Sequence, residues 1–201
     1  GFFVTNDKSA AVDNVALGLG DTDGTTGISS TGTVEITVTN ALTLEDPIVA
    51  NGQLVALTGT NGAILSNSTD PADNDDIDIN VGSSGTIALR SGANIGVIGN
   101  PVEIDAGTLA FTATGDVFVN DRVSGLVIND VDTIGASSGG GAIVLTSSNI
   151  GATTDNTLQF SHSVAATGTL MAIAIDTAKQ TGDSVIVDDG DTISGTTVTL
   201  S

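Results

Sequence analysis

The chain of 201 residues contains no cysteine, tryptophan or tyrosine, and only four of its residues are lysine or arginine. Without cysteine it can form neither a disulfide framework nor a thiolate metal site. It carries 24 acidic residues and a net charge of −20. Because proteins bind phosphate backbones and anionic membranes through lysine and arginine, we expect binding to neither nucleic acid nor an anionic membrane surface. No stretch approaches the ~18 apolar residues of a membrane-spanning helix, so no membrane span is predicted.

Aromatic residues are also scarce, since the only ones are five phenylalanines, whereas 26 residues are glycine. A core must therefore be built from valine, isoleucine, leucine and alanine, with roughly 1.5–3 kcal/mol gained for each large aliphatic side chain that becomes fully buried. The chain is long enough to bury such a core as one large all-β domain or two small ones. Small aliphatic side chains favour a narrow interior lined by many short strands.

The stretch 85–119, GTIALRSGANIGVIGNPVEIDAGTLAFTATGDVFV, alternates apolar with small polar residues. Ile87 and Leu89 form one such pair and Leu109 and Phe111 another, with glycine, asparagine or proline between the runs. Period-2 alternation is typical of strands with one buried face, and frequent breakers indicate that the strands are short. Similar runs occur at 32–39, 52–58, 62–66, 77–81, 125–130, 141–147, 156–160, 168–175, 184–187 and 196–200. The sequence therefore predicts an all-β fold.

Two segments resemble each other beyond composition, namely GTIALRSGANIG at 85–96 and GAIVLTSSNIG at 141–151. GQLVALTGTNGAI at 52–64 is a looser third copy. Irregularly spaced repeats of this kind indicate a solenoid whose turns contact only their neighbours, here with roughly 20 residues per turn and about ten turns. Asparagine tolerates left-handed backbone and bonds neighbouring amides, which suits it to turn corners. The asparagines expected there are Asn61, Asn94 and Asn149.

We therefore expect a parallel β-solenoid body over residues 32–201, preceded by an irregular N-terminal cap or docking segment over residues 1–31. Tandem β-sandwich domains are the alternative, divided near the acidic segment 68–76. Antiparallel sandwich strands also alternate and turn at short intervals, so the pattern alone is compatible with both architectures.

The stretch 85–119 contains, in order, N-I-G, then N-P-V-x-I, then G-T-L, and finally G-D-V-F-V. In these cues it resembles the strand repeats of filamentous-haemagglutinin-type adhesins and related large secreted bacterial proteins. The resemblance is clearest over 85–119 and weaker over 125–175. It implies a right-handed parallel β-helix, export to the surface of a bacterium or an archaeon, and a role in adhesion or matrix building. Carbohydrate or other cell-surface ligands would be the partners of such an adhesin.

Carboxylates are concentrated in the segment DPADNDDIDIN, which holds Asp70, Asp73, Asp75, Asp76 and Asp78. Ca²⁺ takes 6–8 oxygen ligands from carboxylates, amides and backbone carbonyls, so this segment is a candidate calcium site. Its residue order departs from the EF-hand loop, and a solvated acidic loop is the alternative interpretation. Smaller acidic groups at 21–23 and 183–191 are further candidates, and no other cofactor is expected.

Little in the sequence points to catalysis. The single histidine, His162, lies between Ser161 and Ser163, whose side chains would point away from it on a strand. Cleavage of a glycan usually needs two carboxylates, for which the candidates are Asp116, Asp121, Asp130 and Asp132. The chain lacks, however, the tryptophan and tyrosine platforms of most sugar clefts. We predict that the protein is not an enzyme, with a β-helix polysaccharide-active enzyme as the alternative.

Two other local patterns have structural interpretations. Arg122 is expected to pair with Asp121 or Asp130 at the surface, where an ion pair contributes less than ~1 kcal/mol. The glycine-rich GASSGGGA at 135–142 lacks the ending of a phosphate-binding loop and is predicted to be a flexible corner.

The predicted function is structural: a subunit or segment of an extracellular fibre, sheath or surface adhesin that assembles through strand and edge pairing between copies. A solenoid end presents backbone groups and an apolar stack, and a terminal strand can complete a neighbour's sheet by β-augmentation. Phe2, Phe3 and Val4 are the residues expected to make this contact. A pilus-like adhesion module is the function that would accompany the β-sandwich alternative.

Overall fold

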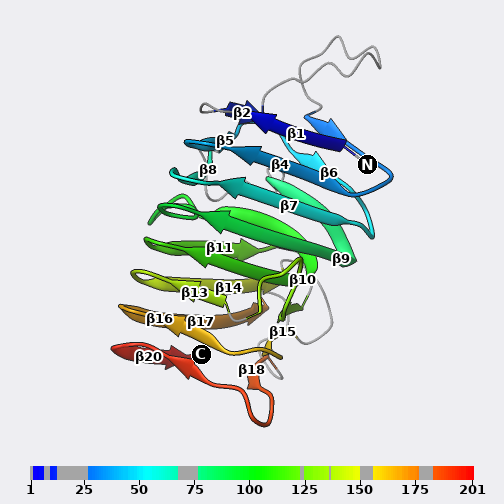
Figure 1. Ribbon diagram of the computed structural model, residues 1–201. Coiled ribbons are helices and arrows are strands. Elements are labelled where there is room, and N and C mark those ends of the chain that lie inside the picture. Colours follow the sequence, from blue (N-terminus) through cyan, green and yellow to red (C-terminus); the bar gives the residue numbers. More distant parts are fainter. Residues whose placement is uncertain are drawn as a thin grey trace.

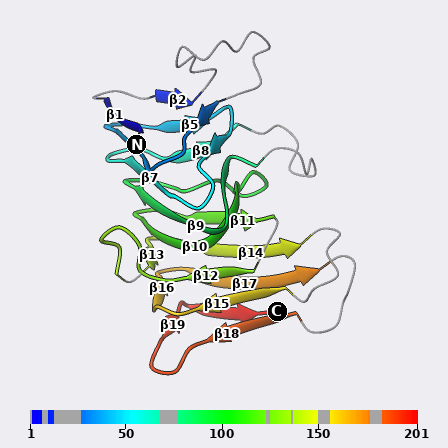
Figure 2. The same ribbon diagram turned by 90° about the vertical axis from the view of Figure 1, so that its right-hand side faces the viewer.

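The computed structural model describes residues 2–6, 10–12, 27–67, 77–122, 125–135, 137–149, 156–176 and 183–201. These ranges contain twenty strands and no helix, so the all-β prediction is confirmed. Within them there is no helix long and apolar enough to cross a membrane. Figures 1 and 2 show the strands lying in layers that follow the sequence from the blue N-terminal end of the molecule to the red C-terminal end.

Parallel pairing joins the strands of successive layers into ladders. The first ladder consists of eight strands, β1 (Phe2–Asn6), β4 (Val34–Val38), β7 (Leu54–Gly59), β9 (Ile79–Ser91), β10 (Val102–Ala113), β12 (Leu126–Ile128), β15 (Thr157–Phe160) and β18 (Ser184–Val187). The second consists of β2 (Ala10–Val12), β5 (Leu42–Leu44) and β8 (Ile64–Ser66), then a bridge at Ile95, then β11 (Val117–Asp121), β14 (Ile143–Asn149), β17 (Thr169–Asp176) and β20 (Thr197–Leu200).

Shorter strands complete the layers. A third ladder runs from β3 (Ile28–Ser29) through β6 (Ile48–Val49) to the first residues of β9 and β10. On the far side of β10, the last residues of that strand pair with β13 (Ser137–Gly139), which is followed by β16 (Val164–Ala166) and β19 (Ile193–Ser194). The described parts of residues 1–31 thus join the same ladders as residues 32–201.

In-register pairing places the apolar side chains of successive layers above one another. Val34 pairs with Val55, and Ile87 pairs with both Val55 and Leu109. All four side chains are fully buried. Because inward side chains pack against equivalents in neighbouring layers, small aliphatic groups fill most of the interior. Phe111 is among the largest buried side chains, and Phe160 is also fully buried.

The alternative of antiparallel sandwich strands does not match the observed pairings. Strands on the two sides of segment 68–76 pair with each other, since β6 and β7 both pair with β9 in parallel. Antiparallel pairing among the described residues is confined to two isolated bridges, Val97 with Asn100 and Val131 with Ile134. Each of these bridges closes a tight turn, and neither joins two of the named strands.

The number of residues between layers is less regular than the roughly 20 per turn that the sequence predicts, and in some layers it is much larger. Leu109 pairs with Ile128, 19 positions later, whereas Val55 pairs with Ile87, 32 positions later. The extra residues lie in the connections that follow strands of the second ladder. A count based on alternating residues leaves these connections out. These connections run between Val12 and Gly27, Asn67 and Ile77, Arg122 and Gly125, Asn149 and Asn156, and Asp176 and Asp183.

The sequence repeats correspond only partly to stacked layers. Segment 52–64 lies beside segment 85–96, because Val55 and Leu57 pair with Ile87 and Leu89. The stronger match at 141–151 does not stack on 85–96, since β14 belongs to the second ladder and pairs with β11. The similarity between 85–96 and 141–151 therefore reflects a shared strand pattern. The looser copy at 52–64 is the segment that stacks on 85–96.

Asparagine has only one of the two roles predicted for it at turn corners. The Asn94 side chain accepts a hydrogen bond from the backbone amide of Asp116 in the next layer, over 3.0 Å. The left-handed backbone conformation was a wrong prediction, because Asp132 and Thr133 are the only described non-glycine residues with positive φ. Asn149 is the last residue of β14 and does not lie at a turn corner.

Segment 135–142 was wrongly predicted to be a flexible corner, because Ser137–Gly139 forms β13 between β10 and β16. Ser137 is fully buried, and its hydroxyl oxygen accepts a hydrogen bond from the backbone amide of Phe111 over 3.2 Å. Glycine next to this strand permits close layers, since a Cβ atom on Gly140 would overlap the Thr114 carbonyl. The glycines thus serve close packing between layers here.

A second, smaller apolar cluster lies outside the main core. The register of β7, β9 and β10 aligns three alanines in successive layers, Ala56, Ala88 and Ala110, all of them buried. The turn at 131–134 covers them with Val131 and Ile134. An ion pair of 2.9 Å between Arg90 and Asp132 holds the turn in this position.

Candidate functional site: the end layers

The strands β18, β19 and β20 form the last layer that the structure describes, at the red end in Figure 1. We call the surface formed by their core-directed side chains the C-terminal face. Its residues are those that pair with core residues of the preceding layer, namely Val185, Val187, Ile193, Val198 and Leu200. These positions continue the columns of core side chains formed by Leu158, Phe160, Val164, Leu170 and Ala172 in the preceding layer.

The side chains of the C-terminal face are more exposed than the core side chains with which they pair. Val198 and Leu200 are 40% and 44% exposed, although Leu170 and Ala172, with which they pair, are fully buried. Val185, Val187 and Ile193 are only partly buried and pack against the end of the core. This group of adjacent exposed apolar side chains makes the C-terminal face a candidate interaction surface.

The backbone of the last layer is also paired on one side only. Ser201 donates its amide to the Ala172 carbonyl over 3.0 Å, and the Ser201 carbonyl accepts the amide of Ala174 over 2.9 Å. Within the described chain, no strand pairs with the opposite edge of β20. Unpaired strand edges are templates for pairing with a further strand.

At the other end, strand β1 contains the three residues that the sequence predicts to make the assembly contact. Phe2, Phe3 and Val4 pair with Val34, Glu35 and Ile36 of β4 in the same chain. The Phe3 side chain is 65% exposed. The ladder pairing of β1 involves only β4 among the strands that are described, so its other edge resembles the outer edge of β20.

Of the five carboxylates in the candidate calcium segment, Asp70, Asp73, Asp75 and Asp76 lie outside the described residues. Asp78 is described and is buried. One of its carboxylate oxygens accepts a hydrogen bond of 3.0 Å from the Ser66 hydroxyl, and the other accepts one of 2.8 Å from the Glu103 amide. Asp78 therefore joins neighbouring layers through both oxygens. Across the described ranges, there is no group of three or more residues of the types that ligate metals.

The acidic group at 183–191 connects the last layer to the one before it. The Asp188 carboxylate accepts hydrogen bonds from the Gln159 amide group at 2.9 Å and 3.0 Å, and from the Ser161 hydroxyl at 2.6 Å. The Asp191 carboxylate accepts a bond of 3.3 Å from the Ser163 hydroxyl. These aspartates therefore act as hydrogen-bond acceptors between layers.

The residues considered for catalysis are not brought together. Ser161 and Ser163 bond to aspartates of the next layer, and no hydrogen bond links either of them to His162 in the described structure. Asp116 accepts a hydrogen bond of 2.7 Å from the Ala142 amide. Asp121 is fully buried and accepts one of 3.0 Å from the Ser147 hydroxyl. The geometry of these groups is that of links between layers.

Arg122 was wrongly predicted to pair with Asp121 or Asp130 at the surface. Its guanidinium lies 2.7 Å from the carboxylate of Glu103, and the two side chains are only 6% and 2% exposed. Glu103 escaped the sequence analysis because it follows a core residue in β10, where alternation predicts an outward side chain. Arg122 was the residue that could have pointed to Glu103, because it follows β11, and β11 pairs with β10.

Asp105, two residues after Glu103 in β10, is also buried, and burial raises the pKa of its carboxyl group above the usual value of 3.8. Between the unfolded and the raised folded pKa, the folded chain binds more protons, so stability falls as pH rises through this window. We expect Asp105→Asn to raise the melting temperature at pH 7 and to leave it unchanged near pH 3. Thermal unfolding followed by circular dichroism at both pH values measures the difference. An equal gain at both would contradict this explanation.

Comparison with known proteins gives no match: no protein-family model, no curated protein and no solved structure matches this chain.

Proposed function

We propose that this protein is a structural subunit or segment that joins end to end with further copies into an extracellular fibre, sheath or surface adhesin of a bacterium or archaeon. In this proposal the chain is a right-handed parallel β-helix, whose successive turns are the observed layers. The observation that carries the proposal is the C-terminal face, where Val198 and Leu200 are exposed although their partners in the preceding layer, Leu170 and Ala172, are fully buried.

Continuation of the ladders would explain how copies join. Every ladder pairing is parallel, so a second copy displaced along the stack could place its β1 beside β18 and its β2 beside β20. Such a contact is head-to-tail, and repetition of a head-to-tail contact produces an open filament. It would cover Val198 and Leu200, each worth roughly 1.5–3 kcal/mol when fully buried. Phe2, Phe3 and Val4 would supply the first strand of the incoming copy.

Charge opposes this association, because each copy carries a net charge of −20. Repulsion of this size is reduced by salt and by bound cations. The acidic segment that contains Asp70, Asp73, Asp75 and Asp76 remains the predicted calcium site. We therefore expect added Ca²⁺ to promote association, and a chelator to reduce it.

Paired substitutions at the C-terminal face test the proposal. We expect the native chain to form linear assemblies, seen by light scattering and electron microscopy, and Val198→Asp combined with Leu200→Asp to leave monomers. Ile186→Asp is the matched control, since Ile186 lies in the same layer, is 42% exposed, and points away from the core between Val185 and Val187. Fibre diffraction of the assemblies should show an axial repeat of about 4.8 Å. Native chains that remain monomeric both with Ca²⁺ and with chelator would refute the proposal.

A further inference from the structure

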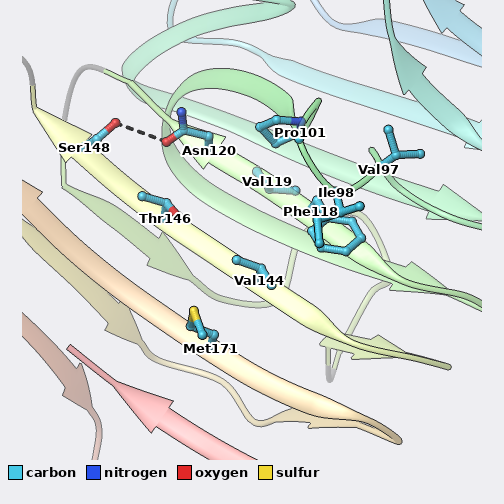
Figure 3. Close-up of a pocket in the computed structure, with 11 residues that line it drawn as sticks. Val97, Ile98, Pro101, Phe118, Val119, Asn120, Val144, Thr146, Ser148 and Met171 are labelled. Atoms are coloured by element: carbon cyan, nitrogen blue, oxygen red, sulfur yellow. Dashed lines mark hydrogen bonds between the residues drawn. The ribbon is translucent and has the colours of Figure 1, made fainter. Parts of the chain in front are cut away.

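A cavity of about 520 Å³ opens on the outer face of β11, β14 and β17, beneath the turn at 97–101. Figure 3 shows its two parts, with Ile98, Phe118, Val144 and Met171 on one side and Asn120, Thr146 and Ser148 on the other. None of the residues that line it is charged. The cavity opens on the outside of the sheet, whereas the C-terminal face is the end of the stack, and the two come nearest at Met171, which pairs with Thr199 of β20.

The floor of the cavity follows from strand register. Phe118 pairs with Val144, and Val144 pairs with Met171, so three outward apolar side chains lie in successive layers. Two positions further along, Asn120 pairs with Thr146 and provides a polar row. The alternation that fills the core with aliphatic groups therefore also builds an apolar strip beside a hydrogen-bonding strip on the outside.

The roof is a closed turn. The amides of Val97 and Asn100 each donate to the other's carbonyl over 3.0 Å, and Gly99 adopts a φ of +81° that few other residues tolerate. The side-chain amide of Asn100 donates to the Ser66 carbonyl over 3.1 Å and fixes the turn to the preceding layers. Ile98 is held at the tip, 84% exposed. A large apolar side chain held rigidly in solvent above an apolar floor indicates a binding site.

The polar row is partly occupied by the protein itself. The Ser148 hydroxyl donates to the side-chain Oδ1 of Asn120 over 3.1 Å. The side-chain amide of Asn120 makes a long bond of 3.4 Å to Glu103. Thr146 has no side-chain hydrogen bond to the described part of the protein, so its hydroxyl is available to a ligand.

We propose that this cavity binds an uncharged small molecule with a largely apolar body and one hydrogen-bonding end. The apolar body would lie on Phe118, Val144 and Met171 beneath Ile98, and the polar end would reach Thr146. The volume lies in the range of about 300–1,000 Å³ typical of sites for small molecules. A lining without basic side chains, on a chain with a net charge of −20, disfavours an anionic ligand.

The neutral fluorescent dye N-phenyl-1-naphthylamine is a suitable probe, because it has an apolar body and a single N–H group. We expect saturable binding to the native chain, and an affinity reduced at least tenfold by Met171→Asp or by Val144→Asp. Thr146→Val is expected to weaken binding less. Ile186→Asp, which changes an exposed apolar residue outside the cavity, should leave the affinity unchanged. Thermal melting of each variant shows that the fold is intact.

The test separates this site from the assembly face. The combined Val198→Asp and Leu200→Asp variant should bind the dye as the native chain does, even where it no longer associates. Binding that is lost in this variant, or that survives both Met171→Asp and Val144→Asp, would overturn the proposal. A native chain that shows no saturable binding would overturn it as well. So would a change of association state in Met171→Asp with dye binding unaltered, because the cavity would then be an interface between proteins.

Discussion

Replacing Arg122 with alanine is expected to lower the free energy of unfolding by about 3–5 kcal/mol. The guanidinium of Arg122 and the carboxylate of Glu103 are 2.7 Å apart and almost completely buried. Removing one partner leaves the other charge in a site that water reaches poorly, and the desolvation of that charge is no longer offset. The prediction is measured by urea denaturation followed by circular dichroism.

Two further variants show whether burial causes the loss. Arg122→Met combined with Glu103→Leu removes both charges and keeps similar volume, so it should recover most of the stability. Arg90→Ala removes the ion pair with Asp132, whose side chains are 27% and 34% exposed, and should cost about 1 kcal/mol or less. Equal losses in Arg122→Ala and Arg90→Ala would contradict the assignment of Arg122 to a buried pair.

Replacing Phe111 with alanine is expected to cost about 3–5 kcal/mol, the range found for removal of a buried phenylalanine side chain. Phe111 is fully buried, and it pairs with Leu89 of the preceding layer. The residues that pair with Phe111 and continue its column in the preceding layers, Leu89 and Leu57, are aliphatic, so neither supplies a ring to fill the space. The void left by Phe111→Ala would lie at the centre of the stack, where β10 pairs with β9, β12 and β13.

Phe118→Ala is the matched control, because Phe118 is the same residue type on the outer face of the adjacent strand β11. Its loss should be clearly smaller than that of Phe111→Ala in the same denaturation experiment. Phe111→Leu should lie between the native chain and Phe111→Ala, since it leaves a smaller void. If Phe118→Ala proved the more damaging substitution, the placement of Phe111 in the core would be in error.

The long strands were predictable from sequence because alternation and glycine boundaries act locally. Segments 32–39, 52–58 and 141–147 contain β4, all of β7 except Gly59, and the first part of β14. The short strands β6, β13 and β19 were not predicted, because two or three residues show no period. These strands form because the neighbouring layers offer backbone partners in register, as the pairing of β13 with β16 shows.

Less of the candidate site could be predicted, because it depends on position in the stack. The segment at 196–200 reads as an ordinary strand, and its sequence does not reveal that Val198 and Leu200 lie in the final layer. The pair formed by Glu103 and Arg122 was missed for a related reason, since its spacing depends on the length of an irregular turn. The cavity beneath Ile98 likewise requires the register that stacks Phe118, Val144 and Met171.

The unequal connections after the second-ladder strands make this protein a natural scaffold for display. The segment 13–26 spans fourteen positions and the segment 123–124 spans two, yet the ladders on both sides of each keep in-register parallel partners. Doubling the length of a flexible connection costs only about 0.6 kcal/mol. A foreign epitope grafted between Asn149 and Asn156 would therefore leave the ladders on both sides in register, and each copy in the filament proposed above would present it again.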